Sequence, residues 1–243
     1  MSKFFSFFPS IDYNFGDESN SNLIQNITLY ADAIDQIKDE KSAYEDYTII
    51  ENMRPDIVSF NLYGSPNFHW TFYFLNNKIR EQGWPISNAN VLKKAKKDHP
   101  NTILTTRSTL SGTNNFLVGD IISGRTSGAT AKISHRYLDL GQLVITDISK
   151  PFIVGEIIQS NRNTTNTITL FSSSLEFNAA HHYENANKEY VDIDPTVGPG
   201  AGITEITYLD RLHSANNDLK QIRVFKENVV SQITQAFREA IAS

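Results

Sequence analysis

The sequence predicts an α+β protein in which short helices and strands accompany one small antiparallel β-barrel. Apolar residues recur at helical spacing near both ends of the chain, with strand-like alternation between them. A seven-residue segment also occurs twice near the middle, and related hairpin units of this kind build small barrels. We therefore expect four segments, which are residues 1–43, 44–107, 108–175 and 176–243.

The first segment, an N-terminal arm followed by a helix, opens with an aromatic cluster. Its rings are those of Phe4, Phe5, Phe7 and Phe8, and Tyr13 follows a few residues later. Leaving such rings in water forfeits roughly 1.5–3 kcal/mol each, so we expect them to be covered. The arm either folds back on its own core or docks into a neighbouring subunit. Residues 23–37 carry apolar residues at helical spacing, which predicts a short amphipathic helix.

Local signals place a strand and a helix at the start of the second segment. Residues 44–50 alternate and are rich in Tyr and Ile, as half-buried strands are. Arg54 and Pro55 begin a helix, because a first-turn proline supplies a helical φ and loses no needed donor. Gly64 ends this helix, since glycine readily adopts the left-handed conformation of a helix C-terminus.

A second helix follows Pro66 and carries Trp70 within a band of aromatic side chains. Because the rings cover nearly every side of this helix, we expect a buried core, and an exposed stacking platform for sugars or bases is the alternative. Tyr63 and Trp84 flank the helices. We expect these two side chains to be partly exposed and count them as candidate interface residues.

The third segment contains the repeat. Residues 116–122 (FLVGDII) recur 36 positions later as residues 152–158 (FIVGEII), with five of seven positions identical. Each copy is predicted to be a strand with a Gly-acidic turn, at Gly119 or Gly155, and a β-branched run follows it. Two copies are too few for a solenoid, so we expect a closed or sandwich-like antiparallel barrel.

The last segment is predicted to be a β-rich connector that ends in a strand and an amphipathic helix. Apolar residues that include Ile233 and Phe237 repeat at helical spacing after residue 229, and this stripe is a further candidate interface. The remaining predicted elements are a weak helix over 87–97 and strands over 102–106, 189–193, 203–209 and 221–225.

Composition limits the kinds of partner that the chain can bind. Charged residues total 20% with a net charge of −5, and aromatic residues total 11%. An acidic chain matches nucleic acid and anionic lipid poorly, so we expect neither as a partner. The one basic run, residues 93–97, is either a solvated helix face or a partner patch. The absence of cysteine excludes thiol chemistry, and no apolar run of about 18 residues could span a bilayer.

No group of residues predicts catalysis, a metal site or a cofactor. His181 and His182 are adjacent, and neighbours on a regular element cannot easily face one ion, so we expect hydrogen bonds or an interface instead. The loop 198–202 is glycine-rich but lacks the Lys-Ser/Thr of a phosphate loop, and Pro199 removes an amide donor. No Gly-x-Ser-x-Gly elbow occurs. We therefore do not expect an enzyme.

Three separated stretches share the motifs of one known family. The longest covers residues 54–85 and includes RPDI, LYGSPNFHW, NN and GWP in that order. The others are FFPSIDY at residues 7–13 and NDLKQIRV at residues 217–224, which a predicted helix follows. In these motifs and their order the chain resembles the baseplate wedge subunit of T4-like contractile-tailed bacteriophages. We take as a structural signature the residues Arg54, Pro55, Gly64, Pro66 and Trp70, together with Gly119 and Gly155 of the repeat.

The resemblance implies a structural role in the virion. Such subunits sit in the inner tail baseplate, join neighbouring wedges into the six-fold ring and transmit the rearrangement that triggers sheath contraction. The implied partners are other wedge proteins and hub or tail-tube proteins, in a hetero-oligomer assembled in the host cytoplasm. The segment 44–107 is similar to a LysM-like β-α-α-β unit, and the barrel of residues 108–175 is an insertion that shorter family members lack.

Two other functions stay open as alternatives. A peptidoglycan- or glycan-binding module is suggested by the LysM-like unit and the Asn/Thr-rich barrel. A cell-wall hydrolase has only scattered carboxylates in its favour.

Overall fold

The computed structural model describes residues 10–14, 16, 22–25, 41–110 and 116–242. Helices and strands are mixed, and a small antiparallel barrel is closed, which confirms the predicted α+β class. The chain divides into two compact units, residues 1–87 with 216–243 and residues 88–215. This division differs from the four predicted segments because a strand late in the chain belongs to the first unit.

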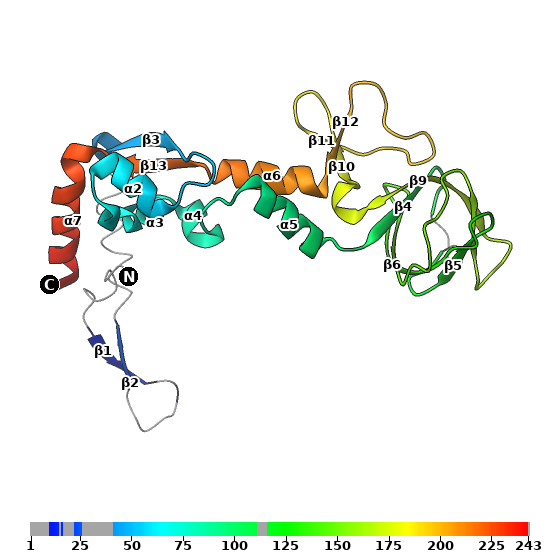
Figure 1. The fold of residues 1–243 in the computed structure, drawn as a ribbon, viewed down its shortest axis with the longest axis horizontal. Helices are drawn as coiled ribbons and strands as arrows, with labels where there is room; N and C mark the ends of the chain where they lie inside the picture. The colour runs from blue at the N-terminus through cyan, green and yellow to red at the C-terminus, as the bar shows by residue number, and fades with distance from the viewer. Residues whose placement is uncertain (1–9, 15, 17–21, 26–40, 111–115, 243) are drawn as a thin grey trace. The chain divides into compact units, whose positions relative to one another are not determined.

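The first unit is built around a two-stranded antiparallel sheet, β3 with β13, and Figure 1 shows these strands side by side with α2 and α3 against them. Its elements are β1 (Ser10–Tyr13), β2 (Asn22–Gln25), η2 (Lys41–Ala43), β3 (Tyr44–Thr48), α2 (Pro55–Tyr63), η3 (Pro66–Phe68), α3 (Trp70–Leu75), α4 (Asn77–Gln82), β13 (Gln221–Phe225) and α7 (Glu227–Ala242).

The predicted boundaries of the first helix are confirmed. Arg54 is the extended residue before α2, and Pro55 occupies the first turn. Gly64 ends the helix with φ of 65°, and its N–H donates to the carbonyl of Phe60 at 2.9 Å. The strand predicted before this helix forms as β3, and the strands predicted over 102–106 and 221–225 form as β4 and β13.

The second predicted helix is divided into three pieces, η3, α3 and α4. Ser65 starts the first piece, since its side chain accepts a hydrogen bond from the Asn67 N–H at 3.3 Å. Asn76 has extended backbone angles of −122° and 102°, so α3 ends there and α4 begins afterwards. The aromatic residues correctly predicted a helix in this region, but nothing in their pattern predicted the break at Asn76.

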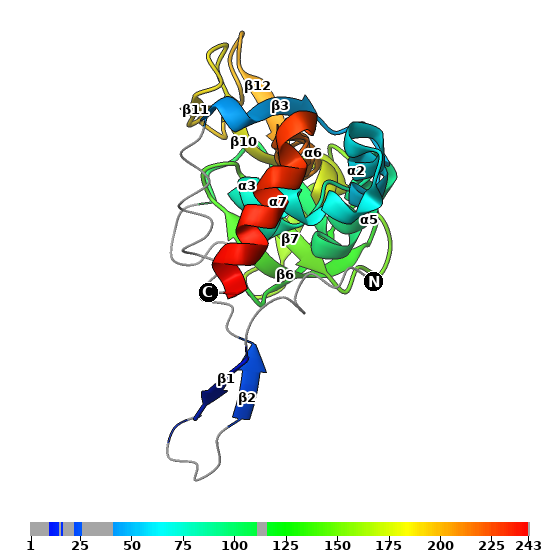
Figure 2. The same ribbon diagram turned by 90° about the vertical axis from the view of Figure 1, so that its left-hand side faces the viewer.

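The core of the first unit lies between the sheet and the helices. Val58 of α2 and Phe72 of α3 are fully buried against Ile222 and Val224 of β13. Helix α7 contributes the buried Val230 to a second cluster that contains Phe74 and Phe225, and Figure 2 shows this helix in front. These contacts confirm the buried-core interpretation of the aromatic band for Phe72 and Phe74.

The helix predicted over residues 23–37 is wrong at its start. Residues 22–25 form strand β2, which pairs antiparallel with β1 and places Ile11 opposite Ile24. A short apolar run fits a helix or a strand equally well, and the cross-strand partner decided between them. Residues 26–40 lie outside the described residues.

The second unit contains the barrel, a three-stranded sheet and two helices, and it ends within α6. Its elements are α5 (Asn88–Asp98), β4 (Thr102–Thr106), β5 (Ile121–Gly124), β6 (Thr130–Tyr137), β7 (Gln142–Thr146), β8 (Ile157–Ser160), β9 (Thr167–Leu175), η4 (Glu176–Asn178), β10 (Ala180–Glu184), β11 (Tyr190–Val191), β12 (Thr204–Thr207) and α6 (Tyr208–Asp218). Helix α5 confirms the weak helix predicted over 87–97.

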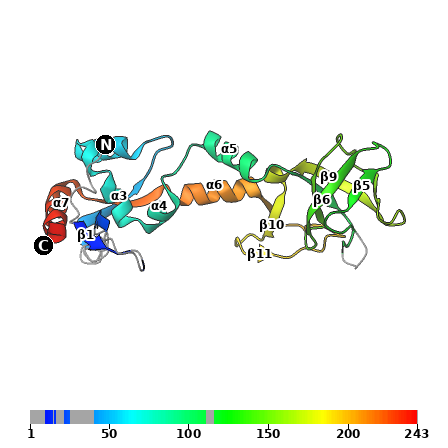
Figure 3. The same cartoon turned by 90° about the horizontal axis from the view of Figure 1, so that it is seen from below.

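The barrel closes in the order β4-β7-β6-β5-β8-β9, and all its neighbouring strands are antiparallel. Figure 3 shows β5, β6 and β9 around it. Inward-facing apolar residues from every strand fill the interior, among them Leu104, Ile133 and Ile158. The predicted closed antiparallel barrel is confirmed.

The sequence repeat appears in the barrel as an internal two-fold relation. Ser123 of β5 pairs with Gln159 of β8, its equivalent 36 positions later, and the flanking pairs exchange equivalent positions. One half of the barrel is therefore β5-β6-β7, and the other is β8-β9-β4. Strand β4 precedes both copies, so the predicted segment boundary at residue 108 leaves out a strand that completes the second half.

The connector differs from prediction in two places. Strand β11 is shorter than the strand expected over 189–193. The strand expected over 203–209 ends at Thr207, where Asp210 caps a helix, α6, that the sequence analysis did not predict. The Thr207 N–H and hydroxyl both donate to Asp210 Oδ2, at 3.0 and 2.7 Å.

The two repeat turns require glycine and are closed by the acidic residue that follows it. Gly119 and Gly155 have φ of 91° and 86°, values that other residues rarely adopt. Their N–H groups donate to the carbonyls of Ile133 and Leu170, both at 2.8 Å. The signature glycines of the barrel therefore have a backbone role.

The carboxylate of Glu156, buried in the barrel wall, connects the two halves. Oε1 accepts from the Ile153 N–H at 2.7 Å and the Ser127 hydroxyl at 2.8 Å, and Oε2 accepts from the Thr126 and Ser127 N–H groups. Burial raises the pKa of Glu156, but these hydrogen bonds together outweigh it and lower the pKa below its ordinary value. Asp120 occupies the equivalent position, and its Oδ1 lies 2.6 Å from Nε of Arg162.

We predict that Glu156→Gln destabilises the protein by about 2 kcal/mol at neutral pH, because the amide nitrogen cannot accept from backbone N–H groups. Since the folded pKa is lowered, the contribution of Glu156 is present above pH 4.5 and is lost as the pH falls through the folded value. Urea denaturation at several pH values should show the two proteins converging in acid. Glu81→Gln, at an exposed position, is the control. Equal stability of Glu156→Gln and wild type at neutral pH would contradict this assignment.

Candidate functional site

The predicted interface residues are only partly described. Phe4, Phe5, Phe7 and Phe8 lie outside the described residues, as do the side chains of Ile233 and Phe237, although their backbone belongs to α7. Tyr13 is on β1 and 48% exposed. As interface residues, all of them stay predictions.

Tyr63 and Trp84 are partly exposed, as predicted, but their polar atoms are used inside the first unit. The Tyr63 hydroxyl donates to the carbonyl of Phe225 at 2.8 Å, and burial raises the pKa of Tyr63 well above its usual range. Trp84 Nε1 donates to the carbonyl of Met53 at 2.7 Å, and its ring lies 5.8 Å from that of Phe72. Both side chains therefore stabilise the fold, whatever they also contact outside it.

Asn76 is the residue whose role the sequence did not reveal. Its Nδ2 donates to the carbonyl of Arg223 at 2.8 Å, and its Oδ1 accepts from the Arg223 N–H at 2.7 Å. Nδ2 also donates to the carbonyl of Phe72 at 2.7 Å, at the end of α3. One amide thus joins the end of a helix to a strand 147 positions away in the sequence. The Asn-Asn pair within the resembling stretch was a signal, but only the fold shows its partner.

Two of the three resembling stretches meet through these contacts. Residues 54–85 supply α2, η3, α3 and α4, and residues 217–224 supply most of β13. With β3, they form a strand-helix-helix-strand arrangement whose strands pair antiparallel, with Asp46 opposite Arg223. The signature residues Pro66 and Trp70 are the first residues of η3 and α3.

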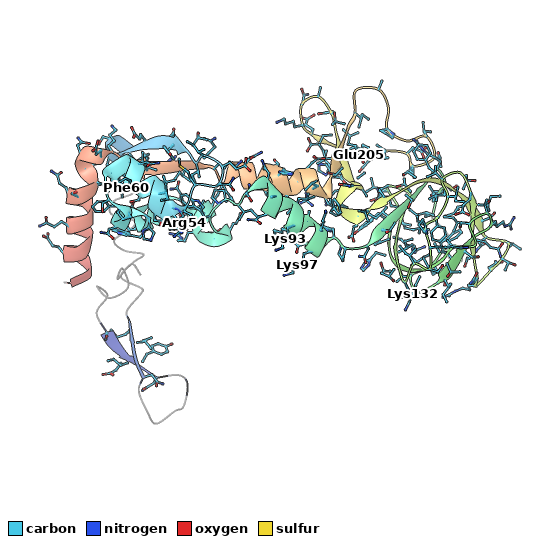
Figure 4. All side chains as sticks on the ribbon, viewed as in Figure 1. Arg54, Phe60, Lys93, Lys97, Lys132 and Glu205 are labelled. Carbon is cyan, nitrogen blue, oxygen red and sulfur yellow. The ribbon has the colours of Figure 1, made fainter. Side chains whose placement is uncertain are left out.

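Exposed apolar side chains form further surfaces that can bind a protein by burial. Ile57 and Phe60, one helical turn apart on α2, are 46% and 56% exposed, and Figure 4 labels Phe60 there. In the barrel, both copies of the repeat expose apolar side chains at equivalent positions. These are Val118 and Ile121 in the first copy and Val154 and Ile157 in the second. The repeat could have identified them, since its identity extends to exposed positions.

The basic run lies on α5. Lys93, Lys94, Lys96 and Lys97 are all exposed, and Figure 4 labels the first and last. Lys94 pairs with Asp98 at 2.7 Å. The predicted helix is confirmed, while the choice between a solvated face and a partner patch stays a prediction.

His181 and His182 meet because strand β10 is irregular. The register of β10 against β12 shifts between Ala180 and His182, and this bulge brings the two imidazoles together, with their Nδ1 atoms 2.9 Å apart. The sequence argument that adjacent histidines cannot easily face one ion holds for a regular element. It does not apply to this bulged strand. Among the described residues, no group of three His, Cys, Asp or Glu could hold a metal ion.

The donors around these histidines define one hydrogen-bonded chain. Arg211 Nη1 lies 2.5 Å from His181 Nε2, and a guanidinium can only donate, so Nε2 accepts and the His181 proton is on Nδ1. That proton is donated to His182 Nδ1, and His182 Nε2 donates to Glu184 Oε1 at 3.0 Å. Burial, then the charge of Arg211, lower the pKa of His181 to about 4. The expectation of hydrogen-bonded histidines is confirmed for this pair.

Comparison with known proteins assigns no family to this chain. A scan against protein-family models and a search of the curated proteins both give no match to this chain. Within the described ranges, no helix is long and apolar enough to cross a membrane.

We predict that at neutral pH His181 is the neutral Nδ1–H tautomer and titrates with a pKa of about 4. Its neutral form stabilises the fold fully above pH 6.5, and this contribution declines as the pH falls toward 4. Nitrogen-detected NMR titration reads both the tautomer and the pKa. Arg211→Gln should raise the pKa toward its ordinary value, whereas Arg125→Gln, in the barrel, should leave it unchanged. A wild-type pKa near 6.5 would refute the proposed chain of donors.

Proposed function

We propose that this chain is a structural subunit of a bacteriophage tail baseplate wedge. In this role it joins neighbouring wedges in the inner baseplate and couples baseplate rearrangement to sheath contraction. The observation that carries the proposal is that the resembling stretches 54–85 and 217–224, far apart in the sequence, fold into one unit through Asn76 and Arg223. Motifs that fold into one unit support a resemblance to a family more strongly than separate matches to short patterns do.

The same unit supports a LysM-like identity for the signature. Its order is β3, α2, α3 and β13, and the first and last of these strands pair antiparallel. The second strand is β13 in place of β4, which belongs to the barrel. In this proposal the barrel unit is an insertion between the helices and the closing strand of a LysM-like unit.

An assembly subunit also needs apolar surface that is covered on assembly. Exposed apolar residues on α2 and at the two repeat turns supply such surface among the described residues. The proposed partners are other wedge proteins and hub or tail-tube proteins, the proposed location is the virion baseplate, and no enzymatic step is proposed.

We predict that deleting residues 1–15 weakens assembly more than folding, because the arm rather than the core is removed. Co-expression with wedge proteins, followed by purification of the complex, should lose the truncated chain while its melting temperature changes little. Val197→Ser, in an exposed loop, is the control that should assemble normally. A full-length chain that stays monomeric beside every wedge protein would refute the baseplate proposal.

Glycan binding is the second candidate, and one cavity favours it. A cavity of about 530 Å³ beside β13 is lined by residues that include Tyr44, Asn77, Lys78 and Gln221, and the Arg223 guanidinium lies 5.1 Å from the centre of the Tyr44 ring. Aromatic side chains with a few polar groups are typical of pockets that bind small ligands.

We predict that, if this candidate holds, peptidoglycan or chitin beads retain the chain and Tyr44→Ala reduces retention at least tenfold. Tyr190→Ala removes a tyrosine that is 62% exposed in the second unit and should bind as wild type does. Failure of wild type to bind either polymer excludes this candidate and leaves the baseplate proposal intact.

A further inference from the structure

One edge of the β3–β13 sheet is closed by side chains. The main-chain N–H and C=O of Arg223 both bond to the Asn76 amide, and the carbonyl of Phe225 accepts from the Tyr63 hydroxyl. These groups lie on the side of β13 that faces away from β3. A polar side chain thus takes the place of a third strand at this edge.

The register shows which groups of β3 point outward. Residues opposite each other in an antiparallel pair either bond to each other or both point away. Because Arg223 points away from β3, Asp46 opposite it points away from β13. The same holds two residues on either side, for Tyr44 and Thr48. Their N–H and C=O groups have no hydrogen-bond partner among the described residues.

The open edge of β3 is acidic and unsuited to pairing with itself. Glu45 and Asp46 are exposed, and this five-residue strand carries no basic residue. In an antiparallel pair of two β3 strands that uses all three outward residues, two Asp46 carboxylates would lie opposite each other. Like charges in this position are destabilising, so the edge favours a strand with a basic residue at its centre.

The arm of this chain has that chemistry. Residues 1–5 (MSKFF) contain Lys3 at their centre and no acidic residue or proline, and their two phenylalanines favour strands. These residues lie outside the described part of the chain. An antiparallel register with Lys3 opposite Asp46 also places Phe5 opposite Tyr44, and aromatic cross-strand pairs are favourable.

We propose that residues 1–5 of one copy of this chain add as a third strand to the open edge of β3 in a second copy. Main-chain hydrogen bonds to Tyr44, Asp46 and Thr48 supply the affinity, and the Lys3–Asp46 pair sets the register. The inference stands on the sheet edge and does not depend on the baseplate proposal.

Sedimentation velocity of the full-length chain over a range of concentrations tests this proposal. Asp46→Pro removes one outward N–H and leaves the β3–β13 bonds in place, since proline is tolerated at a strand edge. It should abolish association while the melting temperature is retained. Thr48→Pro, also at an outward position, is the second edge variant, in case position 46 does not tolerate the change.

A charge exchange separates this contact from a general loss of stability. Lys3→Glu and Asp46→Lys should each weaken self-association about tenfold, equivalent to about 1.4 kcal/mol. The double variant, which carries both changes, should restore it. A wild-type chain that is monomeric at every concentration overturns the proposal. So does an edge variant that folds and associates as wild type does, or a double variant that is not restored. None of these results bears on binding to wedge proteins, which the co-expression experiment measures.

Discussion

The Asn76 amide, bonded to both main-chain groups of Arg223, is the contact on which the first unit depends. It ends α3, turns the chain into α4 and holds β13 against the helices, although β13 is 147 positions further along the sequence. Asn216 makes a similar contact within the same unit, since its side chain accepts from the N–H and donates to the carbonyl of Ile86, both at 2.9 Å. The Asn76 amide therefore takes the place of a further strand at the edge of β13, and the Asn216 amide joins the two segments of the chain where they leave the first unit.

The barrel uses carboxylates where the first unit uses amides. Glu156 binds the turn that follows β5, and Asp120, its repeat equivalent, contacts Arg162 after β8. Each half of the barrel thus supplies a buried acid for the turn of the other half. The exchange gives the acidic position a structural role in both copies of the repeat. These polar contacts also fix the orientation of the two halves of the barrel, which apolar packing alone would not specify.

Surfaces suited to protein contacts occur on both units. The first unit has the exposed turn of α2 and the open edge of β3, and the second has the paired apolar positions of the repeat. The Arg211–His181–His182–Glu184 chain is a different kind of feature, because it joins an arginine to a glutamate through two histidine rings. The exposed apolar surfaces are the features on which the proposed structural role rests.

Local chemistry in the sequence determined the first helix, with Pro55 at its start and Gly64 at its end, and the repeat determined the barrel. These signals are local because capping and turn geometry depend on a few neighbouring residues. The tertiary structure alone decided that β13 pairs with β3, that β4 completes the barrel, and that a bulge brings His181 to His182. Each of these depends on hydrogen bonds between residues distant in sequence, whose partners no local pattern specifies. The uneven burial of the aromatic band has the same cause, since the positions of β13 and α7 determine which rings are covered.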